Sequence, residues 1–130
     1  MTSLAYVDAS ALAKLILDEP GSDAMRRWYV ESERAVTSRV GVVEAYRAAA
    51  RRPHDPAHLD LILRSIEIVE FDAAIAKSAV SVGPPALKTL DAIHLASALA
   101  MLNELDAFVT YDNRLAEAGR AIGLPVIAPA

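Results

Sequence analysis

The sequence predicts an α/β fold: a single domain in which one parallel sheet is flanked by helices on both faces. The chain has 130 residues, the commonest size of one domain and enough to bury a core without disulfides. Short runs of β-forming residues alternate with helical segments along the whole chain. The clearest break, Gly83-Pro84-Pro85, has no flank long enough for a second domain. We therefore expect a loop there and one domain over residues 1–130.

Five segments have the composition of strands, and seven others have the pattern of helices. The predicted strands are Leu4–Val7, Ala35–Ser38, Ile66–Phe71, Ala107–Thr110 and Val126–Ala128. The predicted helices are Ser10–Leu17, Asp23–Glu31, Gly41–Arg52, Pro56–Ser65, Ala73–Val82, Thr89–Asn103 and Asn113–Ile122.

Local signals mark several of these boundaries, in chain order. Gly21 marks the exit from the first helix, Pro56 suits the first position of a helix, and Asp72 suits an N-cap. Gly123 and Pro125 then mark the exit that precedes the last strand. The alternation of strand and helix is therefore supported by turn chemistry as well as by apolar pattern.

Composition excludes some classes of site. The chain has no cysteine, so thiolate metal sites, thiol nucleophiles and disulfides are excluded. No stretch approaches the roughly 18 apolar residues of a membrane span, and we expect a cytoplasmic protein that does not bind membranes. The net charge of -4 argues against broad attraction to a polyanion. Arginines nevertheless gather at Arg26-Arg27 and at Arg47, Arg51 and Arg52, either as local positive fields or as solvated helix faces.

Two acidic residues follow predicted strands. Asp8 comes directly after Leu4–Val7, Asp112 comes shortly after Ala107–Thr110, and a helical segment follows each acid. In open parallel sheets, ligands bind outside the carboxyl ends of the strands. We therefore expect both carboxylates at the functional rim of the sheet.

Two further acids lie on predicted helices, and each has a structural alternative. Asp91 is in the first turn of the most apolar helix, where the helix dipole favours a carboxylate by roughly 0.3–1 kcal/mol, so it can serve as a cap. Glu44 follows the second strand and can face solvent or pair with Arg47 at i+3. For either residue alone, the sequence leaves these alternatives open.

The four acids together point to a metal site. Carboxylates brought within about 5 Å of one another repel by several kcal/mol per pair at an effective dielectric constant near 20, so they require a cation. Mg²⁺ and Mn²⁺ are hard cations that prefer carboxylate and water ligands. Such a site is suited to phosphodiester hydrolysis, because the metal activates water and neutralises phosphate charge.

Three segments carry a resemblance to a known family: Tyr6–Leu15, Leu90–Ala96 and Val109–Leu115, in that order and with Glu44 between the first two. Together they resemble a PIN-domain ribonuclease and, within that family, the VapC toxins of bacterial toxin–antitoxin pairs. The resemblance covers essentially the whole chain. It implies a doubly wound, five-stranded parallel sheet in the order 3-2-1-4-5. It also implies a Mg²⁺- or Mn²⁺-dependent endoribonuclease toxin that cuts RNA to leave a 5′ phosphate, is inhibited by a VapB-type antitoxin and forms a homodimer.

The resemblance also assigns roles to individual residues. Asp8, Glu44, Asp91 and Asp112 match the acidic quartet that binds metal and supports catalysis in the family. Thr110 and Ser10 match hydroxyl residues that orient a ligand or a metal-bound water. For Ser10, a helix cap is the alternative.

Other residues near the acids have weaker signals. Lys88 and Arg114 suit phosphate contacts, although each is as well placed to pair with a carboxylate of the site. For His94, a packed hydrogen bond in an apolar helix is favoured over metal ligation. Trp28 and Tyr29 suit base stacking, but we favour a contact of the first two helices with the antitoxin or a second subunit.

Three other classes of protein share some of these features. A receiver domain requires adjacent acids after the first strand and a lysine at the last one, whereas Asp8 is followed by Ala9 and the last strand has no lysine. An aspartate-nucleophile phosphatase requires a second aspartate where Ser10 stands. A noncatalytic PIN-like RNA-binding or regulatory module remains the alternative to the nuclease.

Overall fold

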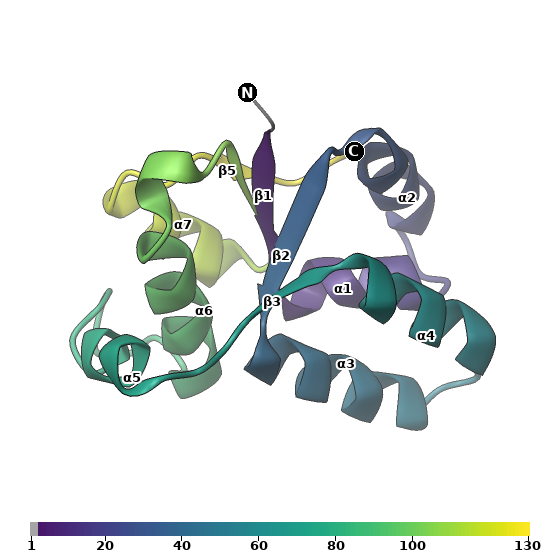
Figure 1. Ribbon diagram of the computed structural model, residues 1–130, viewed down its shortest axis with the longest axis horizontal. Helices are drawn as coiled ribbons and strands as arrows, with labels where there is room; N and C mark the ends of the chain where they lie inside the picture. Colours follow the sequence, from purple (N-terminus) through teal and green to yellow (C-terminus); the bar gives the residue numbers. More distant parts are fainter. Residues whose placement is uncertain (1–2) are drawn as a thin grey trace.

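The computed structural model describes residues 3–130 and contains a five-stranded sheet in the order β3-β2-β1-β4-β5, with neighbouring strands parallel (Figure 1). This confirms the predicted strand order. Met1 and Thr2, the start of the predicted 1–130 domain, lie outside the described residues. The strands are β1 (Leu4–Val7), β2 (Arg34–Ser38), β3 (Glu67–Val69), β4 (Ala107–Val109) and β5 (Val126–Ile127).

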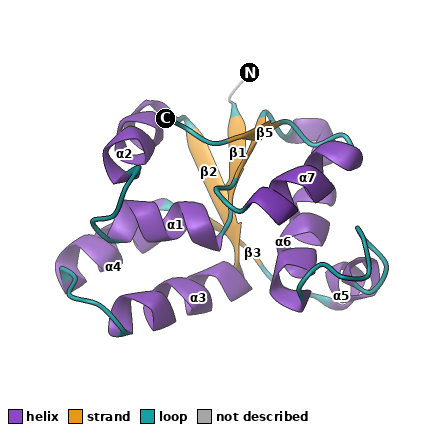
Figure 2. Ribbon diagram, turned by 180° about the vertical axis from the view of Figure 1, so that it is seen from behind, coloured by secondary structure: helices purple, strands orange, loops and turns teal. Residues whose placement is uncertain are grey.

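The sheet lies between two groups of helices (Figures 1 and 2). Helices α1–α4 cover one face, α6 and α7 cover the other, and α5 packs on α6. Their bounds are α1 (Ala9–Ile16), α2 (Ser22–Glu31), α3 (Arg39–Ala50), α4 (Pro56–Ser65), α5 (Ala73–Ala79), α6 (Thr89–Leu99) and α7 (Asn113–Ala121). Within residues 3–130, none of the helices combines the length and apolar character needed to cross a membrane.

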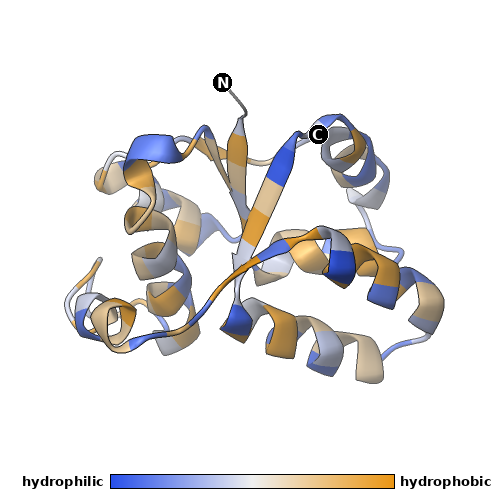
Figure 3. Ribbon diagram, in the orientation of Figure 1, coloured by the Kyte–Doolittle hydropathy of each residue, from blue (hydrophilic) through white to orange (hydrophobic). Residues whose placement is uncertain are grey.

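The central strand β1 is buried on both faces because its side chains alternate between two cores. Ala5 and Val7 join the core under α1–α4, whereas Leu4 and Tyr6 join the core under α6 and α7. The neighbouring strand β2 starts polar and exposed at Arg34 and is apolar in its middle (Figure 3). Burial on both faces explains why β1 reads as a continuous apolar run.

Helices α1 and α3 begin earlier than predicted because a residue at or just after the end of the preceding strand caps each of them. The Asp8 carboxylate accepts a hydrogen bond from Ala11 N, so α1 begins at Ala9 rather than at Ser10. The interpretation of Ser10 as the cap is therefore wrong. In the same way, the Ser38 hydroxyl accepts from Val40 N, and α3 begins at Arg39. Strand-end side chains thus set the start of both helices.

Three other elements are shorter than predicted. Strand β3 spans Glu67–Val69 instead of Ile66–Phe71, because it lies at the sheet edge and pairs only with β2. Helix α5 ends at Ala79, before the loop in which Gly83 has a positive φ of 71°. Helix α6 ends at Leu99, and a separate, exposed 3₁₀ turn, η1 (Leu102–Glu104), follows it. The remaining ends match the prediction or differ from it by one or two residues.

We predict that Leu95→Ala lowers the free energy of unfolding by about 2–5 kcal/mol, because Leu95 is fully buried between α6 and the sheet and its removal leaves a cavity. The matched control is Leu61→Ala on α4, where the side chain is 65% exposed and the expected change is within about 0.5 kcal/mol. Urea unfolding followed by circular dichroism measures both. Equal losses in the two variants would contradict this assignment of the core.

Candidate active site

A pocket of about 390 Å³ lies at the carboxyl ends of the central strands. All four acids that the sequence analysis singled out line it, and they come from separate places in the chain: the end of β1, α3, the first turn of α6 and the start of α7. The lining residues are Asp8, Ala9, Ser10, Glu44, Lys88, Thr89, Leu90, Asp91 and Asp112. Ala9, Thr89 and Leu90 are the lining residues to which the sequence analysis gave no role in the site.

Asp8 is the most deeply buried of these acids, with 2% of its surface exposed. One carboxylate oxygen accepts hydrogen bonds from Ser10 Oγ at 2.7 Å and Ala11 N at 2.9 Å, and the other accepts from Thr110 Oγ1 at 2.5 Å. Burial raises the pKa of the Asp8 carboxyl, and the hydrogen bonds from Thr110, Ala11 and Ser10 oppose that rise. The carboxylate therefore has a fixed orientation.

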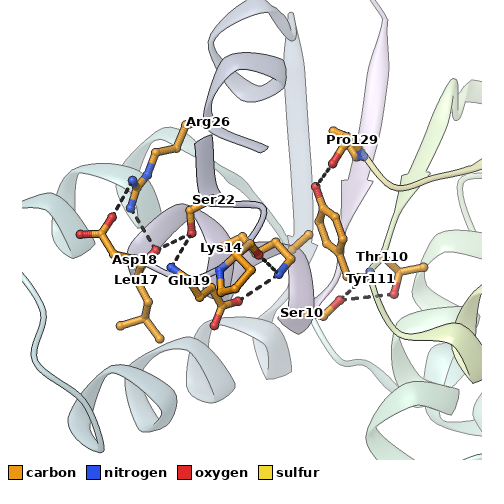
Figure 4. A network of polar contacts seen from close by, with 12 residues as sticks. Ser10, Lys14, Leu17, Asp18, Glu19, Ser22, Arg26, Thr110, Tyr111 and Pro129 are labelled. Atoms are coloured by element: carbon orange, nitrogen blue, oxygen red, sulfur yellow. Dashed lines mark hydrogen bonds and ion pairs between the residues drawn. The ribbon is translucent and has the colours of Figure 1, made fainter. Parts of the chain in front are cut away.

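The two hydroxyl residues join the ends of β1 and β4. Ser10 Oγ accepts a hydrogen bond from Tyr111 N at 2.8 Å, and Thr110 Oγ1 accepts one from Asp112 N at 3.1 Å. Figure 4 shows Ser10 beside Thr110 and Tyr111. Both hydroxyls donate to Asp8, so their observed role is to orient a carboxylate of the pocket.

Tyr111 fixes the segment that follows β4. Its hydroxyl donates to Pro129 O at 2.6 Å, and the Lys14 ammonium lies 4.7 Å from the centre of its ring (Figure 4). The next residue, Asp112, caps α7 by accepting a hydrogen bond from Leu115 N at 3.0 Å. These contacts hold the backbone that carries Asp112 at the pocket.

Asp91 has the clearest electrostatic signature of the site. Partial burial raises the pKa of its carboxyl, and the negative charges of Asp112, Asp8 and Glu44 raise it further, while His94 opposes them. Asp91 is not the cap of its helix, because α6 begins after Lys88 with no side-chain capping bond. Its position is therefore explained by the acidic pocket better than by helix capping.

Glu44 is held by a histidine rather than by Arg47. His94 Nε2 lies 2.7 Å from Glu44 Oε1, and the Glu44 side chain is 24% exposed at the pocket. His94 itself is fully buried, and its Nδ1 lies 2.7 Å from the Tyr6 hydroxyl. The packed hydrogen bond predicted for His94 is thus confirmed, and the alternatives for Glu44, a free solvent-facing side chain or a pair with Arg47, are wrong.

The basic and aromatic candidates divide into two groups. Lys88 lines the pocket, whereas Arg114 is exposed on the first turn of α7 and does not line it. Trp28 and Tyr29 pack partly against the core under α1–α4, and Tyr29 bonds to Ser65 at 2.6 Å. The structure therefore places only Lys88 of these residues beside the acids.

The pocket offers the oxygen donors that Mg²⁺ and Mn²⁺ prefer, which are carboxylates and hydroxyls. Within residues 3–130, no three acidic or histidine side chains converge closely enough to hold a bare ion by themselves. The donors fit a hydrated cation, since Mg²⁺ usually keeps several waters and contacts one or two carboxylates. Burial raises the pKa of Asp91, and the negative charges of Asp112, Asp8 and Glu44 raise it further, which supports this fit because a cation would offset those charges.

The sequence is similar to proteins that are named ribonucleases. Ribonuclease VapC47 of Mycobacterium tuberculosis (strain CDC 1551 / Oshkosh) is 38% identical over 130 residues, covering 95% of this chain and 96% of the relative. Ribonuclease VapC35 of the same strain is 42% identical over 129 residues, again covering 95% and 96%. Both relatives match this chain over nearly their full length.

Solved structures share the fold. The Mycobacterium tuberculosis toxin VapC20, described as cleaving the sarcin-ricin loop, superposes with a TM-score of 0.74 at 16% identity, covering 96% of this chain and 99% of that one. A toxin–antitoxin complex from Klebsiella pneumoniae gives a TM-score of 0.68 at 20% identity, covering 97% and 98%. At these identities, the likeness establishes the fold alone.

The family model described as PIN domain matches residues 5–121, from the central strand to the end of α7. This span includes all four pocket acids and both hydroxyl residues. Together with the identity to full-length relatives, it establishes that the chain belongs to the PIN-domain family and, within it, to the VapC type.

Proposed function

We propose that this chain is a Mg²⁺- or Mn²⁺-dependent endoribonuclease toxin that hydrolyses RNA phosphodiester bonds and leaves a 5′ phosphate. The observation that carries the proposal is the convergence of Asp8, Glu44, Asp91 and Asp112 on one pocket at the strand ends. Relatives named ribonucleases, with 38% and 42% identity, support RNA as the substrate. The raised pKa of Asp91 supports a bound cation.

In this proposal, the four carboxylates hold a hydrated metal ion directly or through its waters, and the hydroxyls hold Asp8. Hydrogen bonds from Ser10 and Thr110 orient the Asp8 carboxylate before any metal binds. Metal binding therefore requires less rearrangement of this side chain. The bound cation would supply a water of lowered pKa and charge neutralisation at the phosphate. Lys88, which lines the same pocket, is the candidate for a direct phosphate contact. Arg114 is exposed on α7 and does not line the pocket. We therefore propose that it contacts a phosphate farther along the RNA.

The proposed partners are RNA, a VapB-type antitoxin and a second copy of the chain. Solved toxin–antitoxin assemblies share the fold, which supports an antitoxin. Apolar side chains exposed at the surface suit protein contacts: Val30 on α2 is 82% exposed, and Val43 and Tyr46 on α3 are 53% and 46% exposed. We propose that α1 and α2 contact the antitoxin or the second subunit. We also propose that the toxin acts on RNA in the cytoplasm.

A noncatalytic RNA-binding module is the alternative. It shares the fold and the family but requires no metal, and it predicts RNA binding without cleavage. The acidic pocket favours the nuclease, because four carboxylates repel RNA phosphates unless a cation lies between them. Metal-dependent cleavage is therefore the property that separates the two functions.

We predict that Asp91→Asn lowers RNA cleavage by more than about 100-fold, because loss of even an outer-shell partner of a metal site costs about 10–100-fold. The measurement uses transfer and ribosomal RNA fragments with Mg²⁺ or Mn²⁺, and with chelator, which should also abolish cleavage.

Asp23→Asn is the matched control for this experiment. Asp23 also lies in the first turn of a helix, α2, but it is exposed and away from the pocket, so its variant should cleave at the wild-type rate. Near-normal cleavage by Asp91→Asn would remove Asp91 from the site. Retained RNA binding without cleavage by the wild-type protein would favour the noncatalytic module.

We also predict a pH-dependent gain of stability in Asp91→Asn when metal is absent. The folded pKa of Asp91 is raised above an unfolded value of about 3.9, so the folded state binds the proton more tightly and stability falls as pH rises through the folded pKa. Asparagine removes this penalty. The variant should therefore have a higher Tm than wild type at pH 7 with chelator, and the difference should shrink towards pH 4.

Thermal unfolding by circular dichroism, at both pH values with chelator, measures this difference. Addition of Mg²⁺ at pH 7 should raise the Tm of wild type more than that of the variant, because binding stabilises the folded state. A Tm difference that is the same at pH 7 and pH 4 would show that carboxylate repulsion does not act at Asp91.

A further inference from the structure

A chain of two hydrogen bonds connects the interior of the sheet to the pocket. It runs from the Tyr6 hydroxyl on β1 to His94 Nδ1 on α6 at 2.7 Å, and from His94 Nε2 to Glu44 Oε1 on α3 at 2.7 Å. Tyr6 and His94 are fully buried, whereas Glu44 lines the pocket. His94 therefore reaches the pocket only through Glu44.

The chemistry of the three groups sets the direction of both bonds. A glutamate carboxylate only accepts hydrogen bonds, so His94 Nε2 carries the proton and donates it to Glu44. Nδ1 of a neutral ring is then an acceptor and receives the Tyr6 hydroxyl proton. Burial raises the pKa of the Tyr6 phenol, which keeps that hydroxyl protonated. The contacts with Tyr6 and Glu44 therefore require the same neutral tautomer of His94, in which Nε2 carries the proton and Nδ1 does not.

Residues of β1 and α3 pack closely against the His94 ring and fix its position. Tyr6 meets His94 edge to face, with ring centres 5.8 Å apart, and stacks on Phe108 at 5.4 Å. On the opposite side, Gly41 of α3 leaves room for the ring: a Cβ there would lie 3.2 Å from His94 Cε1 and 2.5 Å from Thr37 Oγ1. Helix α3 therefore approaches His94 closely at Gly41 and presents Glu44 one turn later.

We propose that His94 is a positioning residue, which holds the Glu44 carboxylate towards the pocket with Tyr6 fixing its ring. The inference rests on the proposed function, since Glu44 needs positioning only if the pocket binds metal. Without this bond, the Glu44 side chain is free to rotate on a helix surface and can turn towards Arg47 at i+3. The bond thus removes side-chain freedom that metal binding would otherwise have to remove.

Two substitutions of His94 distinguish the loss of its hydrogen bond to Glu44 from the loss of its packing in the core. In His94→Gln, the amide nitrogen reaches the place of Nε2 and can still donate to Glu44, whereas the shorter side chain in His94→Asn reaches only the place of Nδ1. We expect His94→Gln to keep kcat and Mn²⁺ affinity within about threefold of wild type. We expect His94→Asn to lower both by about 10–100-fold, with the KM for RNA within about twofold.

His58→Asn is the matched control. His58 also bonds through Nε2, to Leu15 O at 2.7 Å, but it lies on α4 outside the acidic pocket. Its variant should lose stability and keep Mn²⁺ affinity. Equal Mn²⁺ affinities for His94→Gln and His94→Asn, or a matching loss in His58→Asn, would overturn the positioning role.

A double substitution tests whether His94 acts through Glu44. In a Glu44→Gln background, replacing His94 by asparagine should cause no further loss of Mn²⁺ affinity or kcat, because the group that it positions is already altered. An undiminished second loss would show that His94 acts by another route and would overturn the inference.

Metal affinity and tautomer can be measured without cleavage. Mn²⁺ titration followed by electron paramagnetic resonance gives the affinity. If the wild-type protein binds Mn²⁺ but cuts no RNA, the proposed nuclease function is refuted. The Mn²⁺ affinities of the His94 variants would still test the positioning role in that case.

Nitrogen-15 NMR of wild-type His94 reports which ring nitrogen carries the proton and requires no variant to fold. A proton on Nε2 supports the inference, and a neutral ring protonated on Nδ1 overturns it.

Discussion

Asp8 stands at the carboxyl end of the central strand with 2% of its surface exposed, and three protein groups donate hydrogen bonds to its carboxylate. A buried carboxylate without such donors costs several kcal/mol, so Asp8 is compatible with the fold only while Ser10, Ala11 and Thr110 keep their places. These donors come from α1 and from the end of β4. The helix start and the pairing of the two strands therefore depend on the same carboxylate.

The parallel pairing of β1 with β4 explains how residues 102 positions apart meet. Val7 pairs with Val109, so the next residues, Asp8 and Thr110, leave the sheet side by side and bond directly. The long crossover from β3 to β4 carries α6 to the opposite face from α3. Both helices start at the same rim of the sheet, so Asp91 in the first turn of α6 and Glu44 in the second turn of α3 reach one pocket.

Sequence reasoning succeeds here for most of the local signals and for what the resemblance supplies. The Asp72 cap and the apolar run of β1 are local signals that the structure confirms, whereas the extent of β3 depends on its place at the sheet edge. The strand order came from the family resemblance. The partner of Glu44 was missed, because its bond to His94 spans 50 positions and depends on how α3 and α6 pack. The exposure of Arg114 likewise depends on the face that α7 presents to solvent.

The negative charges of the pocket suit cation binding but lower the stability of the folded state. Asp112, Asp8 and Glu44 all raise the pKa of Asp91, so the ionised pocket opposes folding at neutral pH. The protein compensates through two apolar cores on opposite faces of the sheet and through neutral donors on Asp8, instead of neutralising the acids with nearby arginines. Permanent ion pairs would stabilise the empty pocket but would compete with a cation for the same oxygens. The bidentate pairs among the described arginines, Arg34–Glu67 and Arg39–Glu70, lie elsewhere and are exposed. They leave the negative charge of the pocket for a ligand.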